Sequence, residues 1–150
     1  MRAVLQRVSK ASVKVDGELT GSIDWGFVIL LGVVPEDTID DVKWLANKCS
    51  NMRVFSDEEG KMNLSIKDID GKFLVVSQFT LHASTKKGNR PSFIKAARPD
   101  HAIPMYEKFC EELYTASGQN VEKGVFGADM KVDILNDGPV TIIIDSKAKE

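Results

Sequence analysis

The polar side chains best placed to do chemistry lie in the stretch SQFTL, residues 77–81, which ends the apolar segment GKFLVV. Ser77, Gln78 and Thr80 carry two hydroxyls and a carboxamide, which can position a substrate, although a hydroxyl needs a neighbouring base to act as a nucleophile. If the strand continues through this stretch, Gln78 and Thr80 point to one face and Ser77 to the other. Polar groups at the carboxyl end of a central strand often form a binding site, so the pattern favours a site here. An ordinary strand end is the alternative.

The groups that usually activate a hydroxyl or bind a metal are not arranged around this stretch. The two histidines, His82 and His101, lack a third group spaced to orient them, so we expect both at the surface. The two cysteines, Cys49 and Cys110, lie in separate predicted helices and not in a metal-binding or redox motif. No glycine-rich loop leads from a strand into a helix as phosphate-binding loops do. We therefore expect no metal and no cofactor, and a reduced, cytoplasmic protein.

A basic segment follows SQFTL. Five basic residues and no acidic residue lie between Ser77 and Pro99, namely Lys86, Lys87, Arg90, Lys95 and Arg98. The net charge of the whole chain is −2 and this segment contributes +5, so the remaining residues carry −7. A single basic segment in an acidic protein is typical of a contact with phosphate. A solvated loop that binds nothing is the alternative.

A second unusual stretch, NDGPVT at residues 136–141, stands directly before the apolar run Ile142-Ile143-Ile144. Asp-Gly-Pro is typical of a turn, and Val-Thr-Ile-Ile-Ile is typical of a strand. We interpret this region as a hairpin in which ADMKVDIL and PVTIIID pair around NDG. The alternative is that the Gly-Pro peptide is backbone held against something that has to be recognised.

The composition is that of an ordinary globular chain, with 43% hydrophobic and 28% charged residues. No apolar run approaches the roughly 20 residues that span a bilayer, so we expect no contact with a membrane. The first ten residues, MRAVLQRVSK, mix apolar and polar side chains and do not resemble a signal or transit peptide.

The elements that must position these stretches are predicted by periodicity. Strands are expected through residues 4–15 and 19–23, around the turn Asp16-Gly17, and buried strands through residues 25–34 and 71–81. Helices are expected from Ile39, with Thr38 and Asp41 as a capping box, and from about Asp100 to Ser117. The order predicts a single α/β domain over residues 1–150, with mixed sheets in layers and two helices on one face (β/β/α).

Taken together, SQFTL and NDGPVT resemble the paired signature motifs of the D-aminoacyl-tRNA deacylases, the D-tyrosyl-tRNA deacylase family. Five further stretches resemble that family in the same order: QRV (6–8), ASV (11–13), FSDEEGKMN (55–63), RPSF (90–93) and FGADM (126–130). The resemblance covers essentially the whole chain. It implies an ester hydrolase that frees D-amino acids from the 3′-terminal adenosine of tRNA, which is chiral proofreading in translation.

The resemblance also implies a homodimer whose active sites lie at the subunit interface. In that family the peptide that corresponds to Gly138-Pro139 is cis and projects into the site of the partner subunit. A rigid backbone there would reject L-aminoacyl substrates by occupying the space that their side chains need. Arg7 is implied to support the Gly-Pro segment, and a charge on an edge strand is the alternative. Lys86, Lys87 and Arg90 are then expected to contact the acceptor end of the tRNA.

For the reaction itself, the resemblance implies that Ser77, Gln78, Phe79 and Thr80 form the catalytic stretch. Backbone N–H groups near Phe79 and Thr80 are suited to stabilise an oxyanion, and the resemblance suggests that the 2′-hydroxyl of the terminal ribose assists. Thr80 as a covalent nucleophile is disfavoured, because no histidine or lysine is placed by the sequence to deprotonate it.

Three other functions are compatible with the sequence. One is a tRNA-binding or editing-accessory domain without chemistry. Another is a small-molecule ester or amide hydrolase that uses Thr80 and needs no RNA. The third is a dimeric structural protein without any activity.

Overall fold

One long strand connects most of the sheet. In the computed structural model, which describes residues 1–150, β1 (Arg2–Val15) pairs antiparallel with three other strands. Its first half pairs with β3 (Gly26–Gly32) and its second half with β2 (Glu18–Ile23). Along its other edge, β8 (Met130–Asp145) accompanies β1 over nearly its whole length. The first and last strands of the chain are therefore neighbours.

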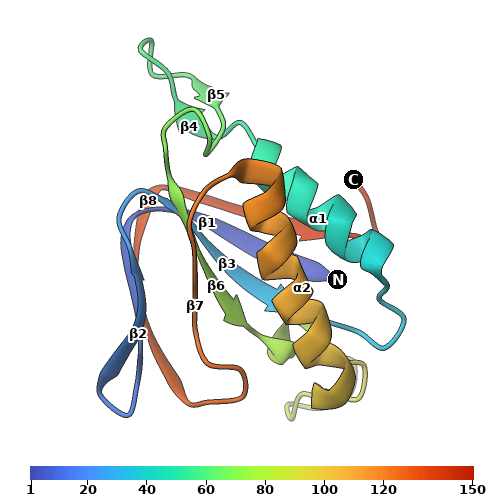
Figure 1. The fold of residues 1–150 in the computed structure, drawn as a ribbon. Helices are drawn as coiled ribbons and strands as arrows, with labels where there is room; N and C mark the ends of the chain where they lie inside the picture. The colour runs from blue at the N-terminus through green and yellow to red at the C-terminus, as the bar shows by residue number, and fades with distance from the viewer.

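Two parallel strands extend the sheet beyond β3. β6 (Lys72–Ser77) pairs with β3, and β7 (Val121–Lys123) pairs with β6, so the order is β2-β1-β3-β6-β7 with β8 beside β1. The sheet is strongly bent, and β2 with the adjoining ends of β1 and β8 curls towards β7 (Figure 1). A Cβ atom at Gly21 would lie 2.9 Å from the Lys123 carbonyl, so glycine permits this close approach. The result is a nearly closed barrel.

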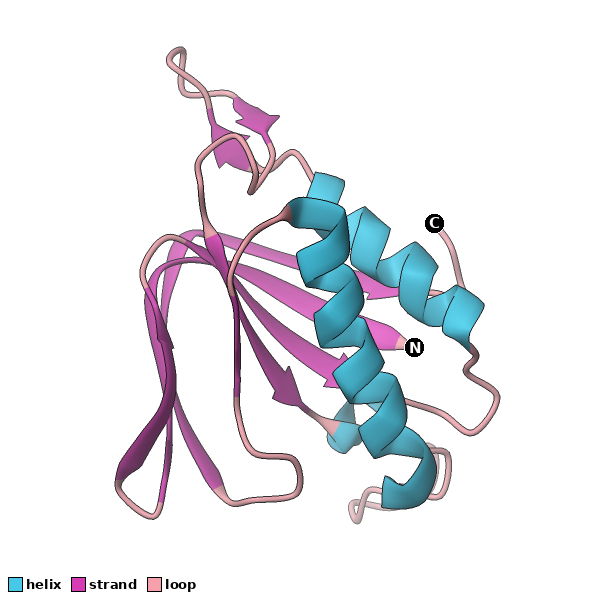
Figure 2. Ribbon diagram, viewed as in Figure 1, coloured by secondary structure: helices cyan, strands magenta, loops and turns pink.

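Two helices cover one face of the sheet, as Figures 1 and 2 show. α1 (Ile39–Asn51) begins at the predicted capping box, in which the Asp41 carboxylate accepts the Thr38 N–H at 2.9 Å. α2 (Pro99–Ser117) begins with a proline at its first position and ends before Gly118. No helix is both long enough and apolar enough to cross a membrane.

The curled sheet and the helices enclose two cores. The larger one lies between the sheet and the helices, and its largest fully buried side chains include Phe27, Phe73, Tyr106 and Phe109. The smaller one lies inside the curl of the sheet and contains Val8, Ala11, Val13, Ile23, Val28, Leu74 and Val76. A short hairpin of β4 (Phe55–Ser56) and β5 (Met62–Leu64) extends from the body. The predicted fold class, α/β with two helices on one face, is confirmed.

The predicted hairpin around NDG is wrong. Residues on both sides of the turn belong to the single strand β8, and both sides pair with β1. Asn136 lies opposite Val8 and Thr141 lies opposite Gln6, so residues 137–140 form a bulge in β8. Turn residues and alternating strands are common to hairpins and to bulged strands, and only the pairing partner distinguishes the two.

The predicted strand through residues 71–81 also ends early. β6 ends at Ser77, and Phe79–His82 form a short 3-10 helix, here called the SQFTL turn. The change follows the bond from the Gln78 N–H to the Leu31 carbonyl (2.8 Å), which is the last hydrogen bond of this strand to β3. The strand alternation predicted for the motif side chains therefore stops before Thr80.

Candidate functional site

The SQFTL turn presents backbone donors at the end of a central strand. Its own hydrogen bonds run from Leu81 N–H to the Gln78 carbonyl (3.2 Å) and from Ala83 N–H to the Thr80 carbonyl (3.1 Å). The first N–H groups of any helical turn, here those of Phe79 and Thr80, have no partner inside the turn. Since the side chains of both residues are exposed, these donors lie near the surface. Two adjacent donors of this kind can bind an anionic oxygen.

The polar side chains of the turn contact one another. The Gln78 carboxamide donates a hydrogen bond to the Thr80 hydroxyl. The sequence predicted that these side chains lie on one face of a strand, whereas here the contact forms across the start of the turn. The Thr80 side chain has no basic group among its hydrogen-bond partners. This arrangement orients the hydroxyl without activating it as a nucleophile.

The expectation that His82 lies at the surface is wrong. Its side chain is buried at the end of the turn, its imidazole packs against Gly32, and Nε2 has no hydrogen-bond partner. Burial lowers the pKa of this imidazole below the ordinary histidine value. Gly32 of β3 explains the burial, because a residue without a side chain leaves room for the imidazole ring. His101 is partly buried, and its Nε2 lies 3.2 Å from the Asp37 carbonyl.

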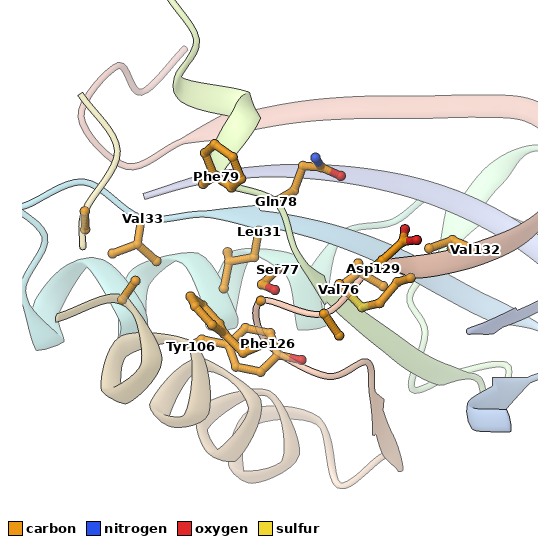
Figure 3. A pocket seen from close by; sticks show the side chains of 15 residues that line it. Leu31, Val33, Val76, Ser77, Gln78, Phe79, Tyr106, Phe126, Asp129 and Val132 are labelled. Atoms are coloured by element: carbon orange, nitrogen blue, oxygen red, sulfur yellow. The ribbon is translucent and has the colours of Figure 1, made fainter. Parts of the chain in front are cut away.

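A cavity of about 250 Å³ opens beside the turn (Figure 3). Tyr106 and Phe126 meet edge to face in its wall, with ring centroids 5.9 Å apart. The Tyr106 hydroxyl is used structurally, because it donates to the Val75 carbonyl at 2.9 Å. Polar groups of Ser77, Gln78 and Asp129 join an otherwise mostly apolar lining, which includes Leu31, Val33, Val76, Phe79, Ala97, Ala102, Gly127, Ala128, Met130 and Val132. The cavity is thus apolar, with polar groups where the motif begins.

The basic segment is folded back beside the turn. Ser84 and Ser92 exchange two backbone hydrogen bonds of 2.8 and 2.9 Å, which close a loop over residues 85–91. This loop carries Lys86, Lys87 and Arg90, all of them exposed. Directly after it, the Phe93 ring meets the Phe79 ring edge to face at 5.1 Å. The three cations are therefore on a closed loop next to the SQFTL turn.

The bulge of β8 projects Gly138 and Pro139 to the surface, and the peptide between them is cis. The largely buried Arg7 side chain lies beneath the bulge. Its Nε donates to the Asp137 carbonyl at 3.1 Å and lies 3.2 Å from the Asp137 carboxylate, while Nη1 donates to the Val54 carbonyl at 2.7 Å. A Cβ atom at Gly138 would lie 3.1 Å from Arg7 Nη2, and the φ of Gly138 is +128°, which side chains rarely adopt.

Asn136, which is not among the residues predicted for the site, closes the base of the bulge. Its Nδ2 donates to the Arg7 carbonyl at 2.9 Å and to the Val140 carbonyl at 3.0 Å. One carboxamide therefore joins the two ends of the bulge to each other and to β1. The signal was an asparagine directly before Asp-Gly-Pro, since asparagine side chains commonly bond nearby backbone in turns.

The Gly-Pro bulge is not part of the cavity beside the SQFTL turn. Neither Gly138 nor Pro139 lines the cavity beside the SQFTL turn, whereas Ser77, Gln78 and Phe79 do. No group of three or more histidine, cysteine or acidic side chains is arranged to hold a metal ion. Both cysteines are buried and unpaired in the helices, and burial raises the pKa of the Cys110 thiol to about 12.

Comparison with known proteins identifies the family. The family model described as D-Tyr-tRNA(Tyr) deacylase matches residues 4–145. Curated D-aminoacyl-tRNA deacylases of Flavobacterium johnsoniae and Akkermansia muciniphila are 57% and 59% identical to this chain over 150 residues, which is the full length of each.

Two solved structures share the fold of this chain. One titled "c-Myc DNA Unwinding Element Binding Protein" has a TM-score of 0.93 and 43% identity, over 99% of this chain and 100% of its own. A probable eukaryotic D-amino acid tRNA deacylase shares the fold, with a TM-score of 0.81 at 17% identity over 95% of this chain and 97% of its own. The fold and these relatives define a class, the deacylases that act on aminoacyl-tRNA. Within it, the chain belongs to the D-Tyr-tRNA(Tyr) deacylase family.

Proposed function

We propose that this protein hydrolyses the ester bond of D-aminoacyl-tRNA to a free D-amino acid and tRNA, and that its Gly-Pro bulge rejects L-aminoacyl substrates. The observation that carries the proposal is the SQFTL turn, which offers unpaired N–H groups beside an apolar cavity. The names of the full-length relatives support the same reaction.

The chemistry needs orientation and charge stabilisation more than a strong base, because an aminoacyl ester is already activated. Water attacks the ester carbonyl, and the negative charge that develops on its oxygen is bound by the N–H groups of Phe79 and Thr80. One such donor typically contributes about 2.7–4 kcal/mol to the transition state. Collapse breaks the bond to the ribose 3′-oxygen, which takes the proton that the attacking water gives up and leaves as a hydroxyl, and the neighbouring 2′-hydroxyl assists this transfer. Gln78 and Thr80 position the substrate, and Ser77 adds a hydroxyl at the edge of the cavity.

The cavity beside the turn is proposed to receive the 3′-terminal adenosine. Aromatic and aliphatic walls bind the flat face of a base, and Tyr106 and Phe126 provide such a wall. The loop with Lys86, Lys87 and Arg90 is proposed to contact phosphates of the acceptor end. Its position directly after the SQFTL turn supports this, and such contacts weaken as the salt concentration rises.

Rejection of L-substrates is proposed to come from the bulge of a second copy of this chain. β8 is an edge strand with an unpaired outer edge, and Ile143 and Leu135 on it are 69% and 61% exposed. Exposed apolar side chains on an open edge are typical of a surface that pairs with another chain. A homodimer formed through this region would bring Gly138 and Pro139 of one subunit to the SQFTL turn of the other. Held by Arg7 and Asn136, the bulge cannot move aside for a side chain of the wrong hand.

The test is hydrolysis of matched D- and L-tyrosyl-tRNA by the purified protein, with the Pro139→Ala variant beside it. We expect rapid release from the D-substrate only, and weaker activity or selectivity in the variant. Thr80→Ala and Thr80→Ser should retain part of the activity, because Thr80 positions and does not attack. A trapped acyl-enzyme would contradict that role. Absence of hydrolysis with continued tRNA binding would favour an accessory domain, and activity on free D-amino-acid esters without RNA would favour a small-molecule hydrolase.

A further inference from the structure

We propose that Arg2 is a positioning residue for this reaction, because its guanidinium links the SQFTL turn to the strand that carries the Gly-Pro bulge. The inference rests on the proposed function and adds a residue that lies outside both signature segments. Arg2 touches neither the cavity nor the bulge, so it would act through the turn and not on the substrate itself.

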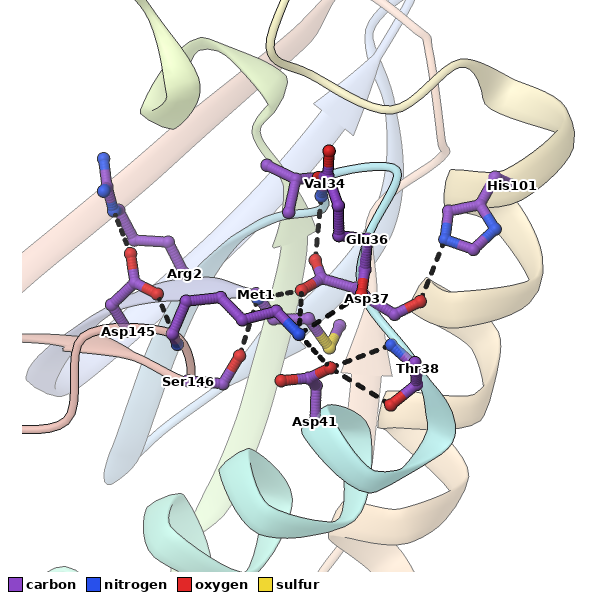
Figure 4. Close-up of polar contacts among 11 residues, drawn as sticks. Met1, Arg2, Val34, Glu36, Asp37, Thr38, Asp41, His101, Asp145 and Ser146 are labelled. Carbon is purple, nitrogen blue, oxygen red and sulfur yellow. Dashed lines mark hydrogen bonds and ion pairs between the residues drawn. The ribbon is translucent and has the colours of Figure 1, made fainter.

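The Arg2 guanidinium forms a bridge between the SQFTL turn and β8, with one hydrogen bond to each. Arg2 Nη1 donates to the Leu81 carbonyl at 2.8 Å, and Arg2 Nε donates to the Asp145 carboxylate at 2.9 Å. Figure 4 shows the second contact, in which Arg2 of β1 faces Asp145 at the end of β8. Leu81 belongs to the last residues of the SQFTL turn, where helical carbonyls lack partners within the helix. The guanidinium therefore supplies the donor that the end of the turn needs.

The far side of the bridge is itself fixed. The other oxygen of the Asp145 carboxylate accepts the backbone N–H of Lys147 at 2.9 Å, so the acceptor for Arg2 cannot rotate freely. A planar guanidinium holds its two donors at a constant angle, whereas a lysine ammonium on a flexible stem does not. The direction of the Leu81 carbonyl, and with it the orientation of the N–H groups of Phe79 and Thr80, is thereby tied to β8.

The bridge is too exposed to contribute much to stability, so the loss of Arg2 can reveal a positioning role without unfolding the protein. The Arg2 side chain is 39% exposed, and ion pairs as exposed as this contribute little to folding stability. Oxyanion donors, by contrast, must be held to within a fraction of an ångström of the position from which they bond to the developing charge. Loss of Arg2 should therefore lower the rate of the chemical step and leave the folded state intact.

The experiment compares Arg2→Met, Arg2→Lys and Asp145→Ala with a control, Lys147→Met. The control removes a side-chain ion pair of the same region, Lys147 to Asp41 at 2.7 Å, which does not touch the turn, and it keeps the backbone N–H that Asp145 accepts. On D-tyrosyl-tRNA we expect Arg2→Met to lower kcat about tenfold with KM changed less than twofold. Arg2→Lys should recover part of the loss, Asp145→Ala should lower kcat in the same direction, and Lys147→Met should leave kcat within about twofold of native. A kcat for Arg2→Met within twofold of native, or an equal loss in Lys147→Met, overturns the proposal.

A second measurement does not depend on activity. Amide hydrogen exchange in the segment 78–84 should be faster in Arg2→Met than in the native protein, and unchanged in Lys147→Met. Equal protection in Arg2→Met and the native protein overturns the anchoring role. If the native protein hydrolyses no D-aminoacyl-tRNA, the proposed function fails by itself, and the exchange measurement still decides whether Arg2 fixes the turn.

Discussion

The SQFTL turn and the Gly-Pro bulge expose backbone in two different ways. The turn follows a fully covered strand, and a buried imidazole lies at its end. The bulge interrupts an edge strand and is held from beneath by side chains, those of Arg7 and Asn136. Both are nonetheless anchored by an arginine of β1, since Arg2 bonds to the turn and Arg7 to the bulge. The turn, which we propose to be catalytic, is thus held by the core and by one side chain, whereas the bulge, which we propose to set selectivity, depends on side chains alone.

The largest effect should come from removing a donor of the turn. Phe79→Pro deletes one N–H at the first position of a helical turn, where proline fits the backbone. With Phe79→Ala as the control for the lost ring, we expect Phe79→Pro to lower kcat by a further factor of about 10²–10³. Single-turnover hydrolysis of D-tyrosyl-tRNA measures it. Equal rates for the two variants would remove the N–H of Phe79 from the mechanism.

A smaller effect, on selectivity, is expected from the bulge. Asn136→Ala removes both bonds that close its base, so the Gly-Pro backbone gains freedom to move away from an L-side chain. We expect the ratio of D- to L-tyrosyl-tRNA hydrolysis to fall about tenfold and the stability to fall by roughly 1–3 kcal/mol. Asn51→Ala, which removes an exposed bond to the Asn47 carbonyl, serves as the control. An unchanged ratio in Asn136→Ala would mean that the bulge does not select by rigidity.

The smallest effect concerns His82, the buried residue at the end of the SQFTL turn. Burial lowers the pKa of His82, so the folded protein keeps this imidazole neutral at a pH where the unfolded chain binds a proton. Because the unfolded state then holds more protons, stability should decline as the pH falls below about 6.5, the ordinary histidine value. Denaturant unfolding at pH 7.5 and pH 5.5 should show a smaller decline in His82→Gln than in the native protein. A native decline in His82→Gln would contradict the prediction.

The difference between the SQFTL turn and the Gly-Pro bulge also explains which features the sequence could predict. The helices and the buried strands follow from local periodicity, and Thr38 with Asp41 marked the start of α1 correctly. The bulge was mistaken for a hairpin because its partner is β1, and the local pattern around Asp137 and Gly138 is the same in both arrangements. The candidate site was predicted from two motifs and a family resemblance, which named Gly138, Pro139 and the supporting Arg7 but not Asn136, the second side chain that holds the bulge.

Contacts between distant residues were the part that the sequence could not provide. Asn136 bonds to the Arg7 carbonyl and Arg2 bonds to the Leu81 carbonyl, and neither pair has a sequence pattern, since any carbonyl can accept. The burial of His82 depends likewise on a glycine in another strand, at residue 32. Such contacts require the sheet order, which periodicity alone does not determine.

The pairing of β1 with β8 sets the timing of folding. β8 begins more than a hundred residues after β1 ends, so the ribosome completes nearly all of the chain before these strands can meet. Long-range pairing of this kind makes folding slow, on the order of milliseconds to seconds for comparable topologies. Until then β1 has one edge without a partner, and an open strand edge is prone to aggregation. Arg2 can therefore bond to the Leu81 carbonyl before β8 is made, whereas Arg7 can support the bulge only at the last step.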